Sequence, residues 1–171
     1  MLHLMQRIAR TREPPTLLSD VVIDEPTARR GTVLDFVENF TACWADPPAH
    51  LHRFLDPLSP DVRLIAPLGN VTRGRRAGQR WLRKTFAALP DLHAVVDGWA
   101  ASEATLFIEM RFRASVGGSP LEWPNVDRFL FVDGLAVERV AYMDPLPVVR
   151  AALARPTGWP QLLRVLCRNG C

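Results

Sequence analysis

The sequence contains few of the residues that would mark it as a disulfide-rich, zinc-binding or membrane-spanning protein. Its three cysteines, Cys43, Cys167 and Cys171, form no Cys-x-x-Cys pair and have no histidine at zinc-ligand spacing, which argues against a disulfide framework and against a metal site. No segment approaches the roughly 18 consecutive apolar residues of a membrane-spanning helix. The N-terminal MLHLMQRIARTR has no continuous apolar run and is a poor secretory signal. We therefore expect a cytoplasmic protein without a transmembrane segment, in which Cys43 is a small core residue.

The sequence also has little excess of either charge, because the net charge is only +3, and Lys84 is the single lysine. A nucleic-acid-binding protein would normally carry a larger basic excess or a basic stripe, so we expect no nucleic-acid partner. One dense basic cluster, TRGRRAGQRWLRK at 72–84, remains. It is either the solvated face of a helix or a site for an anionic group at a helix N-terminus.

Nearly half of the 171 residues are hydrophobic, which is typical of a soluble domain with its own core. We expect a flexible N-terminal arm at 1–30, one domain at 31–156 and an amphipathic helical tail at 157–171. Within the domain, helical periodicity begins at 31–46, where Thr32 can cap the first helix. A second helix at 47–56, a short strand at 61–67 and a third helix at 70–91 follow. Residues 145–156 form a further short helix.

From residue 92 the hydrophobic period changes from helical to two. Four segments rich in β-branched and aromatic residues occupy 92–102, 104–115, 123–134 and 135–144, and the breaks between them are too short for parallel crossovers. The predicted fold class is therefore α+β. A curved antiparallel sheet wraps over three N-terminal helices and forms a cone with an internal pocket.

This order of elements, together with the segments LIAPLGN and NVDRFLFVDGLAVERVAYMDPLP, resembles the nuclear-transport-factor-two-like superfamily. Its enzymes include ketosteroid isomerase, the SnoaL-like polyketide cyclases and limonene epoxide hydrolase, and the resemblance covers about residues 31 to 147. In the isomerase and the cyclases an aspartate faces the pocket from the strand that corresponds to VDRFLF, so the resemblance implies a catalytic role for Asp127.

The resemblance also implies that other catalytic groups are missing. Ala66 stands at the isomerase's general base, Phe40 at its oxyanion-holding tyrosine and Ala141 at an aspartate of the epoxide hydrolase. Steroid isomerisation and epoxide hydrolysis are therefore disfavoured. The SnoaL-like chemistry, an acid/base cyclisation without a cofactor, retains its aspartate.

Strand alternation places Trp123, Asn125, Asp127, Phe129 and Phe131 on one face of their strand. Desolvation on this aromatic face would disfavour the charged form of Asp127 and suit it to proton transfer. The alternative is that Asp127 pairs with an arginine such as Arg111 or Arg113 and only stabilises the sheet. If the apolar side of 104–115 faces the helices, however, these arginines lie in an ion-pair network on the outer face.

Two functions follow from the sequence. The first is a SnoaL-like protein that binds a hydrophobic cyclic or polyketide-like molecule and acts as a cofactor-free cyclase or isomerase through Asp127. The alternative is a non-catalytic ligand-binding or dimerisation module that has lost its base. We expect a homodimer formed through the outer face of the sheet, and a ligand pocket lined by aromatic and polar residues. The predicted substrate-binding residues are Trp44, Trp123, Asn125, Phe129 and Tyr142.

Overall fold

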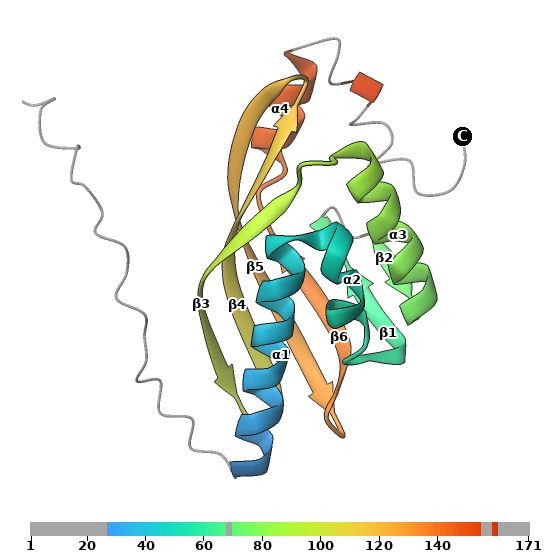
Figure 1. The fold of residues 1–171 in the computed structure, drawn as a ribbon, viewed down its shortest axis with the longest axis vertical. Helices are drawn as coiled ribbons and strands as arrows, with labels where there is room; N and C mark the ends of the chain where they lie inside the picture. The colour runs from blue at the N-terminus through green and yellow to red at the C-terminus, as the bar shows by residue number, and fades with distance from the viewer. Residues whose placement is uncertain (1–26, 68–69, 155–158, 161–171) are drawn as a thin grey trace, which may run out of the picture.

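The structure of the protein is a computed structural model, which describes residues 27–67, 70–154 and 159–160. Three helices precede or interrupt the first strands, and a fourth follows the last strand (Figure 1). Their bounds are α1 Thr27–Ala45, α2 Pro47–Leu55, α3 Arg75–Ala88 and α4 Leu146–Leu153. In Figure 1, α1, α2 and α3 lie on one side of the sheet, while α4 lies near one end of its long strands.

Six strands form one curved sheet in the spatial order β2-β1-β6-β5-β4-β3. Neighbouring strands are antiparallel except for β1 and β6, which run parallel because α3 and the hairpins separate them in sequence. The predicted α+β class and the curved sheet over three helices are confirmed. The strand bounds are β1 Leu58–Ile65, β2 Val71–Arg73, β3 His93–Ser102, β4 Thr105–Val116, β5 Ser119–Val132 and β6 Leu135–Tyr142.

Two predicted helix starts are wrong. Helix α1 begins at Thr27, so Thr32 lies inside the helix and does not cap it. Residues 71–73 form β2 and pair with β1, because Gly74, at φ +86°, ends that strand and provides the N-cap of α3. The rest of the predicted arm and most of the predicted tail at 157–171 lie outside the described residues.

The core lies between the inner face of the sheet and the helices and is dominated by aromatic side chains. Phe129 on β5 contacts the rings of Phe36, Phe40 and Phe54 at centroid distances of 4.8 to 6.4 Å. These edge-on contacts pack α1, α2 and β5 against one another. Between α3, α4 and the inner face of β4, β5 and β6 a cavity remains.

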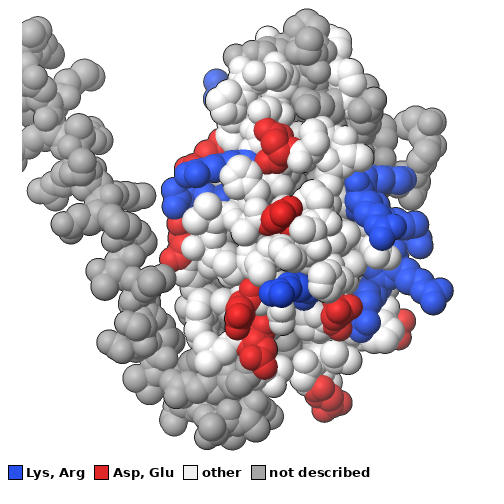
Figure 2. All heavy atoms as spheres, in the orientation of Figure 1, with Lys and Arg blue, Asp and Glu red and all other residues white. Residues whose placement is uncertain are grey.

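The basic cluster at 72–84 lies on the solvent-facing side of α3. Arg76, Arg80, Arg83 and Lys84 are all exposed, and Figure 2 shows basic side chains gathered on the side of the molecule where α3 lies. This agrees with the interpretation of the cluster as a solvated helix face. Within the described part of the chain, no helix is both long enough and apolar enough to cross a membrane.

Candidate functional site

The buried polar centre of the protein is an ion pair between Asp127 on β5 and Arg139 on β6. Nε and Nη2 of Arg139 both lie 2.7 Å from Oδ2 of Asp127, and Nδ2 of Asn125 donates to Oδ1 at 3.0 Å. The Asp127 side chain is 0% exposed and that of Arg139 only 4%. Both carboxylate oxygens of Asp127 thus accept hydrogen bonds from buried donors.

Two aromatic rings flank the guanidinium of Arg139. Its Cζ lies 5.7 Å from the ring centroid of Phe54 and 6.0 Å from that of Trp44. Cation–π attraction at these distances adds to the ion pair and restricts the position of the guanidinium. Arg139 is therefore a positively charged group that its surroundings hold in place.

A β-bulge in β6 turns Arg139 inward. Phe131 pairs with Ala136 and Leu130 with Glu138, so Val137 is the extra residue between them. Without a bulge, Ala136 and Arg139 would face opposite sides of the sheet, but both are buried here. Sequence reasoning missed Arg139 for this reason, because an alternating pattern that starts from buried Ala136 places residue 139 outside.

A cavity of about 180 Å³ lies beside this pair, between α3, α4 and the inner face of β4, β5 and β6. Its walls are mostly apolar. The most polar lining residues are Asn70, Thr72, Thr85, Asn125 and Arg139, and among the lining residues that the structure describes Arg139 alone is charged. The other lining residues are Trp44, Ala66, Pro67, Trp81, Leu82, Leu89, Leu92, Phe112, Trp123, Ala141, Met143, Pro145, Val148 and Val149.

Three of the five predicted substrate-binding residues, Trp44, Trp123 and Asn125, line this cavity. Two do not. Phe129 belongs to the aromatic core and is 0% exposed. Tyr142 is 53% exposed because it follows the inward-facing Ala141 on β6 and so points to the outer side of the sheet.

Asp127 itself is not among the cavity-lining residues, although both of its hydrogen-bond partners are. The carboxylate lies behind Asn125 and Arg139. It can influence a bound molecule by orienting these two side chains, whereas direct contact would require them to move.

Three polar atoms of cavity-lining side chains have no hydrogen-bond partner and are shielded from water. They are the indole Nε1 of Trp44, the indole Nε1 of Trp123 and Oδ1 of Asn125. A buried polar atom without a partner destabilises a protein by about 1–3 kcal/mol. Two donors and one acceptor around the same cavity therefore need a physical explanation.

Three residues that the resemblance places at catalytic positions of related enzymes, Ala66, Ala141 and Phe40, carry no ionisable group. Ala66 and Ala141 both line the cavity, so each presents a methyl group where the resemblance implies an acid. Phe40 is buried in the aromatic core. None of the cavity-lining residues that the structure describes has a carboxylate, and the cavity wall consequently offers no carboxylate base.

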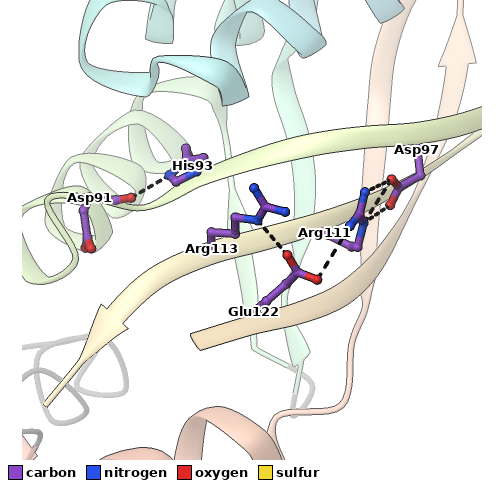
Figure 3. A network of polar contacts seen from close by, with 6 residues as sticks. All are labelled: Asp91, His93, Asp97, Arg111, Arg113 and Glu122. Carbon is purple, nitrogen blue, oxygen red and sulfur yellow. Dashed lines mark hydrogen bonds and ion pairs between the residues drawn. The ribbon is translucent and has the colours of Figure 1, made fainter. Parts of the chain in front are cut away.

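The alternative that Asp127 pairs with an arginine is confirmed, but the partner is Arg139 rather than Arg111 or Arg113. Both arginines lie on the outer face, where Arg111 binds Asp97 at 2.6 Å and Arg113 binds Glu122 at 2.6 Å (Figure 3). Glu122 also lies 3.7 Å from Arg111. These four residues, here called the outer network, confirm the predicted ion pairs on that face. Among the residues described, no cluster of histidine, cysteine and acidic side chains could hold a metal ion.

The helices, the curved open sheet and the cavity between them define an α+β cone of the nuclear-transport-factor-two-like type. More narrowly, the chain belongs to the SnoaL-like domain family, whose sequence profile matches residues 33–139. This confirms the resemblance found in the sequence. No curated protein matches the chain significantly.

Solved structures support the fold. A candidate SnoaL-like polyketide cyclase from Jannaschia sp. CCS1 is similar at TM-score 0.61 and 18% identity, over 69% of this chain and 91% of that one. TsrD from Streptomyces laurentii is 27% identical at TM-score 0.58, over 71% and 95%. A protein with a ketosteroid isomerase-like fold from Catenulispora acidiphila, in complex with trimethylamine, has TM-score 0.62 and 15% identity over 73% and 96%.

Proposed function

We propose that this protein binds a small hydrophobic cyclic molecule in the cavity beside Arg139. The observation that carries the proposal is a largely apolar cavity in which one arginine, paired with Asp127 behind it, is the only charged group among the described lining residues. Such a combination of apolar walls with a few placed polar groups is typical of small-molecule sites. Arg139 and Asn125 would orient the ligand, and Asp127 would hold both in place.

Ligand-induced thermal stabilisation tests this proposal. A panel of steroids, polyketides, terpenes, epoxides and single-ring phenols is screened for an increase in melting temperature. We expect stabilisation by members of the panel, and we expect it to disappear in Leu89→Trp, which fills the cavity from the C-cap of α3. Leu34→Trp, at an exposed position of α1, is the matched control and should respond like the wild type. A panel in which no cyclic compound stabilises the protein would contradict the proposal.

Cofactor-free acid/base chemistry with Asp127, as a cyclase or isomerase, is the second candidate function. It is supported by family membership and by the position of Asp127 one side chain behind the cavity wall, next to Asn125 and Arg139. Epoxide hydrolysis has less support, because Ala141 supplies no acid to the cavity.

Asp127→Asn separates the two functions. The amide keeps the shape of the side chain but cannot take up a proton as a base. Turnover that is lost while ligand binding remains would support catalysis by Asp127. If the wild type binds members of the panel but converts none of them, only the ligand-binding function is supported.

We further propose that two copies of the chain associate through the outer face of the sheet. Apolar side chains are exposed there between the ion pairs, including Val95, Phe107 and Tyr142 at 40%, 41% and 53% exposure. Burial of these side chains against a second copy would remove apolar surface from water. Light scattering after size exclusion should give a dimer for the wild type and a monomer for Phe107→Glu; a monomeric wild type would contradict the proposal.

A further inference from the structure

The cations on and beside α3 differ from the other arginines of the sheet, because they have no acidic partner. The arginines that form ion pairs with carboxylates are Arg63, Arg111, Arg113, Arg128 and Arg139. Within the described residues, the exposed cations without an ion pair include Arg73, Arg76, Arg80, Arg83 and Lys84. No acidic residue occurs between Val62 and Pro90, so the segment itself does not balance this charge. The charge is therefore open to an external anion.

Helical spacing gathers four of these cations on one side of α3. Arg76, Arg80, Arg83 and Lys84 fall within an arc of roughly 100° and along about 12 Å of the helix axis. Leu82 on the opposite side is buried and lines the cavity. Figure 2 shows the basic side chains together where α3 lies. The helix thus has one side against the protein and one basic side in solvent.

Helix α4 exposes large apolar side chains at the same helical spacing. Leu146 and Leu153 are 59% and 58% exposed, and Arg150, also exposed, lies between them on the same side of the helix. On its inner side, Val148 and Val149 line the cavity that α3 also lines. Two helices that wall one cavity therefore present cations and leucines to the solvent.

From these observations we propose that α3 and α4 dock the protein on an anionic lipid surface. Cations attract the headgroups of such a surface, while leucine and tryptophan side chains enter the boundary between headgroups and acyl chains. Trp159, which follows α4 in the sequence, is 52% exposed and of the type enriched at that boundary. A nucleic acid would satisfy the cations, but its interfaces are polar and would leave the leucines in water.

The docking surface is compatible with the proposed dimer and independent of the proposed ligand. Helix α3 lies on the side of the sheet opposite the outer face, so association through the outer face leaves it accessible (Figure 1). Because α3 and α4 also wall the cavity, docking would bring the cavity close to hydrophobic molecules dissolved in the bilayer. The lipid surface itself is recognised by the side chains that point away from the cavity.

Sedimentation of the full chain with lipid vesicles tests the proposal. One set of vesicles contains phosphatidylcholine alone, and the other contains phosphatidylcholine and phosphatidylglycerol at a ratio of about two to one. We expect the protein to sediment with the mixed vesicles and to stay in the supernatant with the neutral ones. Salt at about 1 M should weaken binding to the mixed vesicles more than tenfold, because it screens exposed charges.

Paired substitutions assign the contacts on the protein side. Arg80→Gln/Arg83→Gln removes two cations of α3 and should weaken binding to the mixed vesicles about twentyfold, at about fivefold for each charge. Arg111→Gln/Arg113→Gln, which removes two charges from the outer face, is the matched control and should bind like the wild type. Leu146→Ser/Leu153→Ser should weaken binding more than about tenfold through the lost apolar insertion. The α3 and α4 positions are exposed, so these variants should keep the wild-type melting temperature.

Each other outcome overturns the proposal or one of its parts. Equal binding to neutral and mixed vesicles, or no binding to either, would overturn it. Equal losses in the two arginine variants would show that only net charge matters, and unchanged binding of the leucine variant would remove α4 from the surface. Polyuridylate, compared at the same phosphate concentration, is the nucleic-acid probe. If it binds more tightly than the mixed vesicles, the basic face belongs to a nucleic acid and the lipid proposal fails.

Discussion

The inner and outer faces of the same sheet carry ion pairs of the same chemical kind in very different surroundings. Asp127 and Arg139 are 0% and 4% exposed, whereas Arg113 and Glu122 in the outer network are 47% and 43% exposed. The contact distances, 2.7 and 2.6 Å, are nearly equal. Geometry alone therefore does not rank the pairs. Burial decides how much each side chain depends on its partner, because water can replace a partner outside but not inside.

Both faces use a β-bulge to position one member of a pair. On the inner face the extra residue Val137 turns Arg139 toward the core. On the outer face the register shifts between Val96 and Gly98, so that Asp97 is the extra residue and reaches Arg111. The same device thus creates a buried pair beside the cavity on one side, and a solvated pair on the other.

The largest expected effect follows from breaking the inner pair. Arg139→Met leaves the carboxylate of Asp127 buried with Asn125 as its remaining partner, and removal of one member of a buried pair typically costs about 3–5 kcal/mol. Urea denaturation should show a corresponding drop in the free energy of unfolding. Arg113→Met, the same substitution on the outer face, is the matched control. Equal losses for the two variants would contradict the distinction between the faces.

Replacing the whole inner pair should recover most of that loss. In Asp127→Leu/Arg139→Met no charge remains buried, and such apolar replacements are often neutral or stabilising by about 1–4 kcal/mol relative to the ion pair. We expect the double variant to unfold at higher urea concentration than Arg139→Met while ligand binding stays lost. A double variant less stable than the single one would show that the pair is required for folding rather than for the site.

The core that packs on the inner face should also be sensitive to alkaline pH, through the buried Cys43 of α1. Burial, its largest cause, raises the pKa of this thiol from 9.0 to about 12, and the folded protein is thus stabilised by the protonated form. The free energy of unfolding should therefore be highest below pH 9 and should fall as the pH rises toward 12, by about 2 kcal/mol at pH 10.5. Cys43→Ala should lack this loss. Parallel stability curves for wild type and variant between pH 8 and 10.5 would contradict it.

The smallest expected effect is in the outer network. The hydrogen bond from Arg113, and then the charges of Arg113 and Arg111, lower the pKa of Glu122 from 4.5. Its contribution is thus present above pH 4.5 and lost as the pH falls through the lowered value. Glu122→Gln should reduce the melting temperature only slightly at neutral pH, and the difference should shrink in 1 M salt because exposed charges are screened. A large drop in melting temperature that does not depend on salt would contradict this prediction, because the exposed pair would then contribute as much to stability as the buried one.

Much of the fold could be predicted because it depends on local period. The change from helical spacing to alternation near residue 92 located four strands, and alternation placed Trp123, Asn125, Asp127 and Phe129 on one buried face. At the N-terminus of α4, Asp144 accepts a hydrogen bond from the backbone N–H of Leu146, a contact typical of an aspartate just before a helix. The short strand β2 was missed, because three residues are too few to show a period.

The candidate site was predicted only in part. Trp44, Trp123 and Asn125 line the cavity. Phe129 lies on the same buried face of β5, but it packs against Phe54 in the aromatic core and not at the cavity. Position along a strand decides whether an inward side chain meets packed rings or open space, and that depends on which helix lies opposite. Tyr142 does not line the cavity for a different reason, because its neighbour Ala141 occupies the inward-facing position of β6.

The sequence by itself determined that Asp127 lies on the inner face of a curved sheet, because side chains alternate strictly along a strand whatever packs against it. Only the tertiary structure decided what Asp127 does there. Its partner comes from a strand twelve residues away and faces inward because of one extra residue, Val137. Register shifts of this kind depend on the pairing between two strands, so they cannot be predicted from the sequence of one strand. They made Arg139, and not the carboxylate, the charged group that faces the cavity.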